Sequence, residues 1–362
     1  MSNTAQYAVI MAGGRGERFW PLSTSKRPKQ LLDLVGDRAL IGQAVDRIKE
    51  LIPPDQVFVI TNAELVKATR EALPELPREN IIGEPMGRDT AAAVALGCAL
   101  VEAKNPAASF AILTADQVMG DLPVFNQTLE DALNLARSQD ILITMGIQPA
   151  HPDTGFGYIR ASEPFEAEGN TQFYNVKKFE EKPSLSRAKE FVESGECFWN
   201  SGMFIWSVRS LRKAMMRHCP PLTRLMDLML PHIGTPTFDE KLLAEYERLS
   251  KISIDYALME KADNIVMARG QFTWDDVGSW PALENHFAKD EHGNTLIGNT
   301  EMLVSEGNIV YSRDRLTTLV GVQDLIVVQA EGVTLVCAKD QAQGIKQLVK
   351  RLHERGDCCD LL

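Results

Sequence analysis

Short apolar runs of strand length alternate with amphipathic stretches of helical period along the first part of this chain. The clearest strands are expected at Tyr7–Met11, Val57–Thr61, Phe110–Thr114 and Ile141–Ile147. Helices are expected between them at Ala39–Ile52, Thr90–Lys104 and Val124–Arg137. The alternation predicts an α/β fold with a doubly wound, mostly parallel sheet and helices on both faces. Because ligands of such sheets bind beyond the carboxyl ends of the strands, the residues that follow each strand are the candidate functional residues.

The pattern changes at about His292, where Gly-Asn pairs begin to separate short β-type runs. The chain has 362 residues, more than the ~250–300 at which single cores stop growing, so two domains are expected. We predict one domain over residues 1–292 and a small β domain over 293–362. A β-helix is one option for the small domain, although its spacing is too irregular for a hexapeptide repeat. Its expected elements are Ile309–Ser312, Leu325–Gln329, Val333–Cys337 and a terminal helix at Gln341–His353.

Charge and cysteine usage limit the classes of partner. The formal net charge is −11, which argues against a nucleic-acid-binding or basic membrane-surface protein. The longest apolar run, Ala91–Val101, is shorter than the ~20 residues that span a bilayer, and Met1 to Tyr7 show no export signal. The six cysteines form no CxxC pair or Cys/His cluster, so reduced thiols are expected. We therefore expect a cytoplasmic protein with no nucleic-acid or membrane partner.

A glycine-rich, basic segment follows the first expected strand. It begins Gly13-Gly14-Arg15-Gly16 and continues to Lys29, and it matches neither the P-loop nor the dinucleotide-binding pattern. Glycines allow backbone N–H groups to approach a phosphate closely. Five of the 38 basic residues lie between positions 15 and 29, against one acid, Glu17. This local reversal of charge favours a polyphosphate cradle over a solvated basic loop.

Carboxylates stand at other positions where ligands are expected. Asp116 follows the strand Phe110–Thr114, and Asp275 and Asp276 form a second acidic candidate far along the chain. Two carboxylates brought together would suit Mg²⁺, which prefers oxygen ligands and substrate phosphates. Glu84 precedes the alanine-rich helix, and a carboxylate can accept hydrogen bonds from the N1–H and 2-amino groups of guanine. Helix capping alone would explain the nearby Asp89 and Thr90.

The segment Gly13–Lys29 resembles the Gly-Gly-x-Gly-x-Arg, Pro-Leu and Pro-Lys pattern of the sugar-phosphate nucleotidyltransferases. This resemblance implies that Arg18 and Lys29 contact the triphosphate and the charge that develops on the transferred phosphorus. The segment around Glu84 resembles the guanylyltransferase branch, although Asp89 stands where asparagine is usual and Ala92 or Ala93 where proline is usual. The residues implied to bind the nucleotide are Gly13, Gly14, Arg15, Gly16, Glu84, Arg88 and Thr90.

The same resemblance assigns a metal site and a sugar pocket. It implies Mg²⁺ as cofactor on Asp116 and Asp276, with Gln117 in place of the usual histidine. Three later motifs, Thr154–Ile159, Phe179–Pro183 and Trp199–Phe204, have the order and spacing of the mannose-1-phosphate guanylyltransferases. The residues implied for the sugar phosphate are Gly157, Glu181, Lys182 and Asn200. The implied catalytic residues are Arg18, Lys29, Asp116, Lys182 and Asp276.

The implied reaction converts GTP and mannose 1-phosphate into GDP-mannose and pyrophosphate, and the implied assembly is a homodimer. Another hexose 1-phosphate or nucleoside triphosphate is the alternative within the class. A catalytically silent sugar-nucleotide sensor is a second alternative, but such proteins lose the basic loop or the metal carboxylates. Bifunctional relatives with isomerase activity carry a further histidine-rich β-barrel. This chain ends at Leu362 and has only His353 after Gly293, so we expect no isomerase activity.

Overall fold

The computed structural model describes residues 6–14, 16–356 and 361–362. Two compact units interleave along the sequence. The large unit comprises Met1–Gly13, Ala44–Ala115 and Met119–Trp274, and the small unit comprises Gly14–Gln43, Asp116–Val118 and Asp275–Leu362. The division of the chain at residue 292/293 stays a prediction.

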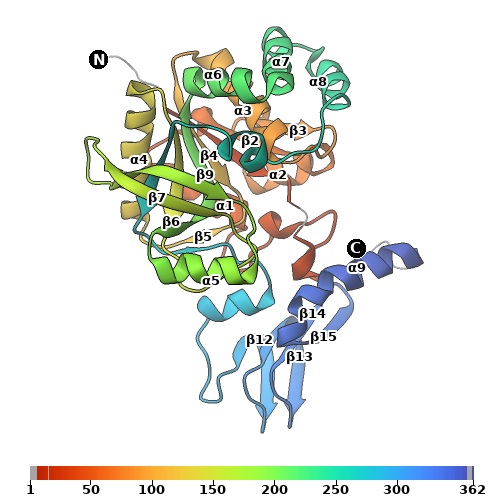
Figure 1. Ribbon diagram of the computed structural model, residues 1–362. Helices are drawn as coiled ribbons and strands as arrows, with labels where there is room; N and C mark the ends of the chain where they lie inside the picture. The colour runs from red at the N-terminus through yellow and green to blue at the C-terminus, as the bar shows by residue number, and fades with distance from the viewer. Residues whose placement is uncertain (1–5, 15, 357–360) are drawn as a thin grey trace. The chain divides into compact units, whose positions relative to one another are not determined.

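The large unit is built on a nine-stranded mixed sheet (Figure 1). Four parallel strands at one edge follow the expected pattern, and the remaining strands add antiparallel pairings through β9, β8 and β7. The α/β class is thereby confirmed, with a mixed sheet. In spatial order the strands are β3 (Ile81–Glu84), β2 (Val57–Asn62), β1 (Gln6–Ala12), β4 (Ser109–Thr114), β9 (Cys197–Ser207), β6 (Leu142–Ile147), β10 (Ile265–Gly270), β8 (Phe173–Glu180) and β7 (Tyr158–Phe165).

Helices cover both faces of this sheet, because every residue from Tyr7 to Ile10 on β1 is buried although neighbouring side chains point to opposite faces. Helix α3 (Thr90–Lys104) packs on β1 and β2 and against α6 (Val208–His218) and α7 (Pro220–Met229), while α4 (Leu122–Ser138) packs on β4, β6, β9 and β10 (Figure 1). The helices of the large unit are α2 (Val66–Ala72), α3 (Thr90–Lys104), α4 (Leu122–Ser138), α5 (Leu185–Ser194), α6 (Val208–His218), α7 (Pro220–Met229) and α8 (Phe238–Tyr246), with a short π-helix at Asp255–Met259.

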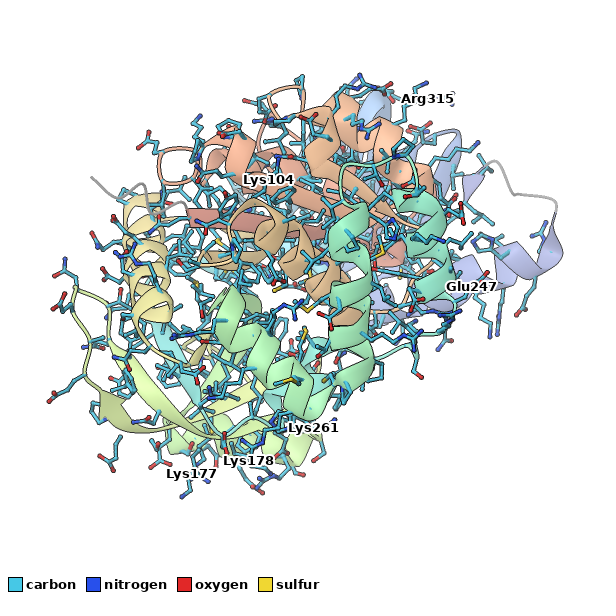
Figure 2. The ribbon with its side chains drawn as sticks, turned by 90° about the horizontal axis from the view of Figure 1, so that it is seen from above. Lys104, Lys177, Lys178, Glu247, Lys261 and Arg315 are labelled. Atoms are coloured by element: carbon cyan, nitrogen blue, oxygen red, sulfur yellow. The ribbon has the colours of Figure 1, made fainter. Side chains whose placement is uncertain are left out.

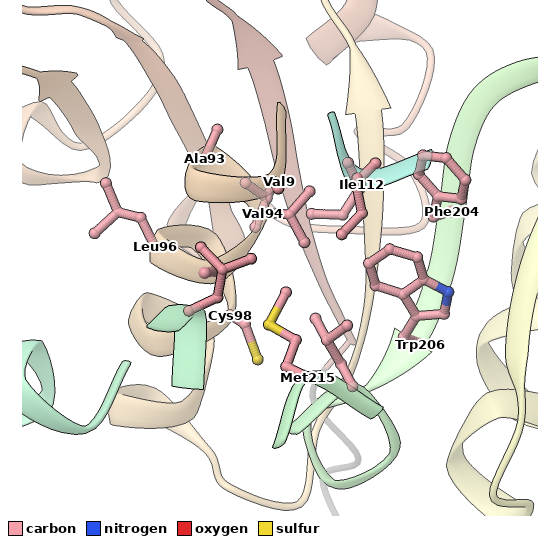
Figure 3. Packing of buried hydrophobic residues seen from close by; sticks show 14 of the residues in the cluster. Val9, Ala93, Val94, Leu96, Cys98, Ile112, Phe204, Trp206 and Met215 are labelled. Atoms are coloured by element: carbon pink, nitrogen blue, oxygen red, sulfur yellow. The ribbon is translucent and has the colours of Figure 1, made fainter. Parts of the chain in front are cut away.

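The core between α3 and the sheet is closely packed. Figure 3 shows Val9 and Ile112 of the sheet facing Val94 and Cys98 of α3. A Cβ at Gly97 would lie 2.7 Å from the Val9 side chain, so this glycine permits the close approach of helix and strand. The alanine-rich composition of α3 serves the same purpose, because small side chains bring a helix close to its neighbours.

Helix α1 (Leu40–Asp46) is shorter than the helix expected at Ala39–Ile52. Beyond Asp46 the backbone continues as tighter turns, in which Ile48 N bonds Val45 O and Leu51 N bonds Ile48 O. The spacing of apolar residues correctly predicts which side chains are buried, since Ile48 and Ile52 are fully buried. It overestimates the length of the α-helix, which ends at Asp46.

The small unit contains a four-stranded sheet in which the first three strands run parallel and the last is antiparallel. Its apolar cluster joins strand residues such as Tyr311 to Phe19 and Trp280. The terminal helix expected at Gln341–His353 begins as a 3-10 turn, Lys339–Gly344, and becomes α-helical at Ile345. The elements are β12 (Thr295–Leu303), β13 (Ile309–Val320), β14 (Leu325–Ala330), β15 (Val333–Ala338), α9 (Ile345–Arg355), and the 3-10 helices η1 (Glu17–Phe19), η2 (Lys29–Leu31) and η8 (Trp280–Asn285).

Two Gly-Asn pairs, Gly293-Asn294 and Gly307-Asn308, form successive turns of this unit, whereas Gly298-Asn299 lies within β12 at a shift of register. Gly293 and Gly307 have φ angles of 75° and 66°, the left-handed region that glycine tolerates. The asparagines that follow them are fully buried and stacked, since Asn308 Nδ2 donates to Asn294 Oδ1 over 3.0 Å. Asn308 Oδ1 in turn accepts from Leu325 N over 2.9 Å. This ladder satisfies the backbone at each turn and fixes the parallel stacking of the strands.

The exposed charged side chains of the large unit include Lys104 on α3 and Lys177 and Lys178 on β8 (Figure 2). Among the described residues, no helix combines the length and hydrophobicity needed to cross a bilayer.

Candidate active site

The glycine-rich loop is held in shape by its own backbone and polar side chains. Gly16 has a φ of 63°, and a Cβ at this position would overlap Lys29 and lie 2.8 Å from its backbone nitrogen. Ser23 Oγ donates to Gly16 O over 2.7 Å, and Gln30 Nε2 donates to Gly14 O over 3.1 Å. These hydrogen bonds hold the backbone oxygens of Gly14 and Gly16 in place. The predicted nucleotide-binding residue Arg15 lies outside the described residues.

A cavity of about 370 Å³ in the small unit brings together four of the five predicted catalytic residues. Lys29 is 5% exposed, and its Nζ donates to Asp116 Oδ2 over 3.1 Å and to the backbone oxygen of Asp276 over 2.5 Å. Arg18 is exposed and donates to Gly278 O over 3.4 Å. The lining residues are Gly16, Glu17, Arg18, Phe19, Lys29, Asp116, Asp276, Gly278 and Lys346.

The two neighbouring aspartates that precede η8 have different surroundings. Asp275 accepts from Asn285 Nδ2 over 2.9 Å and lies 3.0 Å from His286 Nε2, so its carboxylate is occupied by structural partners. Asp276 lines the cavity, where burial raises the pKa of its carboxyl although the Lys29 ammonium opposes that shift. Asp276 is therefore the aspartate of this pair that can serve a ligand in the cavity.

A second group of predicted residues lies at the carboxyl ends of β1, β2 and β3 in the large unit. Asn62 and Glu84 end adjacent parallel strands in register, and Gly13 follows β1. A Cβ at Gly13 would lie 3.5 Å from Glu84 Oε2 and 3.8 Å from Asn62 Oδ1, so the glycine leaves open space over both side chains. Burial raises the pKa of Glu84 to about 7, although the hydroxyl of Tyr246 donates to it over 3.1 Å.

Arg88 and Thr90 make structural contacts beside this group. Arg88 Nε donates to Tyr246 O over 2.7 Å, and Thr90 Oγ1 accepts from Ile254 N over 2.9 Å. Between them, Asp89 accepts from Thr90 N at the start of α3. Arg88 thereby positions Tyr246, the partner of Glu84. The direct nucleotide-binding role predicted for Arg88 and Thr90 stays a prediction.

The predicted sugar-phosphate residues form a third group, also in the large unit. Gly157 has no room for a side chain, because a Cβ there would overlap the Glu181 carboxylate and lie 3.4 Å from Asn200 Cβ. Asn200 N donates to Gly157 O over 2.8 Å. Lys182 Nζ is exposed and lies 3.4 Å from Glu181 Oε1. The structure brings Gly157, Glu181, Lys182 and Asn200 together as the sequence motifs implied.

Asp255, which was not among the predicted site residues, joins this third group. Asn200 Nδ2 donates to Asp255 Oδ1 over 3.0 Å. Burial raises the pKa of Asp255, and burial together with the Asp255 charge raises the pKa of Glu181. Two carboxyls with raised pKa values beside an amide and an ammonium provide donors and acceptors for a polyhydroxylated ligand.

Backbone strain accompanies three of these positions. Asp89 (φ 66°), Lys182 (φ 48°) and Val277 (φ 45°) adopt positive φ angles that non-glycine residues rarely adopt. Val277 directly follows Asp276, and Asp89 lies between Arg88 and Thr90. Such strain persists where the surrounding structure imposes it, and it concentrates at functional sites.

Comparison with known proteins identifies the class. The family model for nucleotidyl transferases matches residues 7–293, and a model described as a MannoseP isomerase/GMP-like beta-helix domain matches residues 298–352. The chain belongs to the nucleotidyl transferase family, and it is an enzyme of the nucleotidyltransferase class.

Its relatives specify the branch as that of the mannose-1-phosphate guanylyltransferases. The chain is 33% identical over 364 residues to the protein of that name from Escherichia coli K12, covering 98% of this chain and 75% of the relative. It is 36% identical over 350 residues to mannose-1-phosphate guanylyltransferase RfbM of Salmonella typhimurium LT2, covering 95% and 72%. A solved structure from Thermus thermophilus, described as a mannose-1-phosphate geranyltransferase, has 34% identity and a TM-score of 0.86, covering 96% of this chain and 99% of that one.

Proposed function

We propose that this enzyme transfers GMP from GTP to mannose 1-phosphate and releases pyrophosphate and GDP-mannose. The observation that carries the proposal is the cavity in which Lys29 bridges Asp116 and the Asp276 backbone beside the glycine-rich loop. The relatives named mannose-1-phosphate guanylyltransferase, whose matches cover 98% and 95% of this chain, support the same reaction. A related reaction with another hexose 1-phosphate or nucleoside triphosphate is the alternative.

The proposed chemistry is a direct displacement. An oxygen of the sugar phosphate forms a bond to the α-phosphorus of GTP, the bond to the bridging oxygen breaks, and that oxygen leaves on pyrophosphate. The attacking phosphate is already anionic, so no protein nucleophile is required. The protein supplies positioning and neutralisation of charge. Arg18 and Lys29 are proposed to offset charge on the triphosphate, and Lys182 to orient the sugar phosphate.

We propose that Glu84 recognises guanine through hydrogen bonds. An ionised carboxylate accepts hydrogen bonds from both N1–H and the 2-amino group, which adenine and uracil do not present together. Gly13 leaves the space above Glu84 open, and Tyr246 holds one carboxylate oxygen. Asn62, which ends the neighbouring strand, adds an amide that the sequence did not single out.

The residues in the small-unit cavity fit a divalent metal ion, which nucleotidyltransferases generally use. Asp276 is a carboxyl whose pKa is raised by burial, beside a second carboxylate at Asp116, and such a pair is stabilised by a cation. We propose that Asp116 and Asp276 hold Mg²⁺, a hard cation that takes its other ligands from water and phosphate. When bound, the ion would neutralise charge on the reacting phosphates. Gln117 bonds the Asp276 carboxyl and orients it.

The sugar is proposed to bind at Gly157, Glu181, Asn200 and Asp255. Their clustered carboxyl and amide groups match the several hydroxyls of a hexose, since carboxylate oxygens accept hydrogen bonds and the Asn200 amide can donate as well as accept. Because Gly157 lacks a side chain, a ring can approach the backbone closely.

Two further properties are proposed. A homodimer is supported by exposed apolar side chains on and beside the sheet of the small unit, among them Leu303, Val304 and Val336, because exposed apolar groups of this kind mark interaction surfaces. A cytoplasmic location is supported by the free thiols of Cys98, Cys197, Cys219 and Cys337 in the described part of the chain, as expected in a reducing compartment.

A substrate panel tests the proposed specificity. Pyrophosphate release is measured with GTP, ATP, UTP or dTTP, each paired with mannose, glucose or galactose 1-phosphate in the presence of Mg²⁺. The proposal predicts the highest kcat/KM for GTP with mannose 1-phosphate. A higher value for any other pair would replace the proposed substrates, while release with no pair would reject the reaction itself.

A further inference from the structure

The C-terminal helix α9 packs against the glycine-rich loop within the small unit. It contacts η1, and Ile345 and Val349 are buried in the same apolar cluster as Phe19 and Trp20. The last residues of the chain add polar contacts, because Trp20 Nε1 donates to Leu361 O over 2.8 Å. The position of α9 relative to the loop is therefore fixed by buried side chains on both elements.

This packing places Lys346 at the cavity of the small unit that also contains Lys29 and Asp276. Lys346 follows Ile345 on the first turn of α9 and is one of the residues that line the cavity with Arg18 and Lys29. Its side chain is 65% exposed, and its Nζ lies 3.9 Å from Glu17 Oε2. The ammonium is thus at the open side of the cavity, held loosely by one acid.

The charges around the cavity show why this lysine matters. Three acidic side chains line it, Glu17, Asp116 and Asp276, against three cationic ones, Arg18, Lys29 and Lys346. Lys29 is already bonded to Asp116 and to the Asp276 backbone. Without Lys346, the described lining would carry three acids against two bases, and Glu17 would lose its ion pair with Lys346.

We infer that Lys346 is a phosphate-binding residue of this enzyme, which exchanges Glu17 for the polyphosphate of the nucleotide and for the pyrophosphate that departs. The inference rests on the proposed function for the identity of the nucleotide, but its ligand class, a polyphosphate, follows from the cavity. It makes the C-terminal helix part of the phosphate site. No motif around Lys346 indicates this role, because the residue reaches the loop only through the packing of α9.

The test uses full-length variants at position 346 with a matched control on the same helix. Lys346→Gln removes the charge, Lys346→Glu reverses it and Lys346→Arg retains it. Lys350→Gln is the control, since Lys350 lies one turn further along α9, is exposed, and pairs with Glu354 rather than lining the cavity. The measurements are the Kd of Mg²⁺-pyrophosphate by calorimetry, the KM for each substrate, kcat and the melting temperature.

Lys346→Gln should weaken pyrophosphate binding and raise the KM for the nucleotide about fivefold, the effect of one partly exposed charge contact. Lys346→Glu should weaken pyrophosphate binding further and raise the KM for the nucleotide further. Lys346→Arg should keep both quantities near the wild-type values. The KM for the sugar phosphate and the melting temperature should stay at the wild-type values, as all parameters should in Lys350→Gln.

Unchanged pyrophosphate affinity in both Lys346→Gln and Lys346→Glu would overturn the inference. Equal weakening in Lys350→Gln would also overturn it, because the effect would then be a general loss of positive charge. The calorimetric measurement needs neither guanine nor mannose. A failure of the proposed substrates with intact, Lys346-dependent pyrophosphate binding would therefore count against the proposed function and leave this inference standing.

Discussion

The pKa of Glu84 gives a prediction that couples base recognition to pH. Burial raises this pKa from 4.5 to about 7, and the proposed hydrogen bonds from guanine to Glu84 need the ionised carboxylate. With a pKa near 7, about one-tenth of the free enzyme carries ionised Glu84 at pH 6 and about nine-tenths at pH 8. Since kcat/KM reports ionisations of the free enzyme, the value for GTP should rise about tenfold over this interval.

The same pKa predicts how stability depends on pH. The folded-state pKa lies above the ordinary value, so the fold favours protonated Glu84. The contribution of Glu84 to the free energy of unfolding is complete below about pH 4.5 and is lost as the pH rises through about 7. The shift of about 2.5 units corresponds to about 3 kcal/mol, an order-of-magnitude value for this 6%-exposed side chain. Glu84→Gln should therefore stabilise the free protein at pH 8 and change stability little at pH 4.5.

The assay compares wild type with Glu84→Gln. kcat/KM is measured for GTP and for inosine triphosphate, which lacks the 2-amino group, from pH 5.5 to 8.5, and unfolding by denaturant is followed at pH 4.5 and pH 8. Glu84→Gln should lower kcat/KM for GTP by about 10–100-fold, the loss of charge-assisted hydrogen bonds, and remove the rise near pH 7. A variant that keeps both the rise with pH and the preference for GTP over inosine triphosphate would refute the role assigned to Glu84.

Two substitutions test the other groups. Asp276→Asn should reduce turnover by orders of magnitude with an unchanged melting temperature. Asp275→Asn should instead lower the melting temperature and keep turnover within about tenfold of wild type, since Asp275 bonds Asn285 and His286. Near-normal turnover of Asp276→Asn in Mg²⁺ would contradict the metal assignment. Gly157→Ala should raise the KM for the sugar phosphate and leave the KM for GTP unchanged, because the new Cβ displaces the Glu181 carboxylate. Gly344→Ala is the control outside the three sugar motifs, since a Cβ at Gly344 would meet nothing within 4 Å. Equal changes in the KM for the sugar phosphate in the two variants would contradict the assignment of Gly157.

Local sequence signals predicted the parts of the site that follow strands. The strands at Val57–Thr61 and Phe110–Thr114 were located to within one residue, and α3 has the predicted bounds Thr90–Lys104. Asn62 follows the first of these strands and could have been identified by the rule that singled out Asp116. The parallel half of the sheet followed from the same alternation of strands and helices.

Contacts between distant parts of the chain were not predictable in this way. β9 pairs antiparallel between β4 and β6 although it follows both in sequence, and no local period encodes such a pairing. Asp255 lies within an apolar segment and reaches Asn200 only through the tertiary fold. Lys346 is likewise one of many helical lysines until the packing of α9 brings it to the cavity.

Transfer of GMP to mannose 1-phosphate is tested by measuring both products of one reaction mixture. Purified enzyme is incubated with GTP, mannose 1-phosphate and Mg²⁺, and pyrophosphate and GDP-mannose are quantified over time by chromatography. The account predicts that the two products appear in equal amounts, that omitting the sugar phosphate abolishes both, and that Asp276→Asn abolishes both. Pyrophosphate without GDP-mannose, or product formation that survives loss of the Asp276 carboxylate, would contradict it.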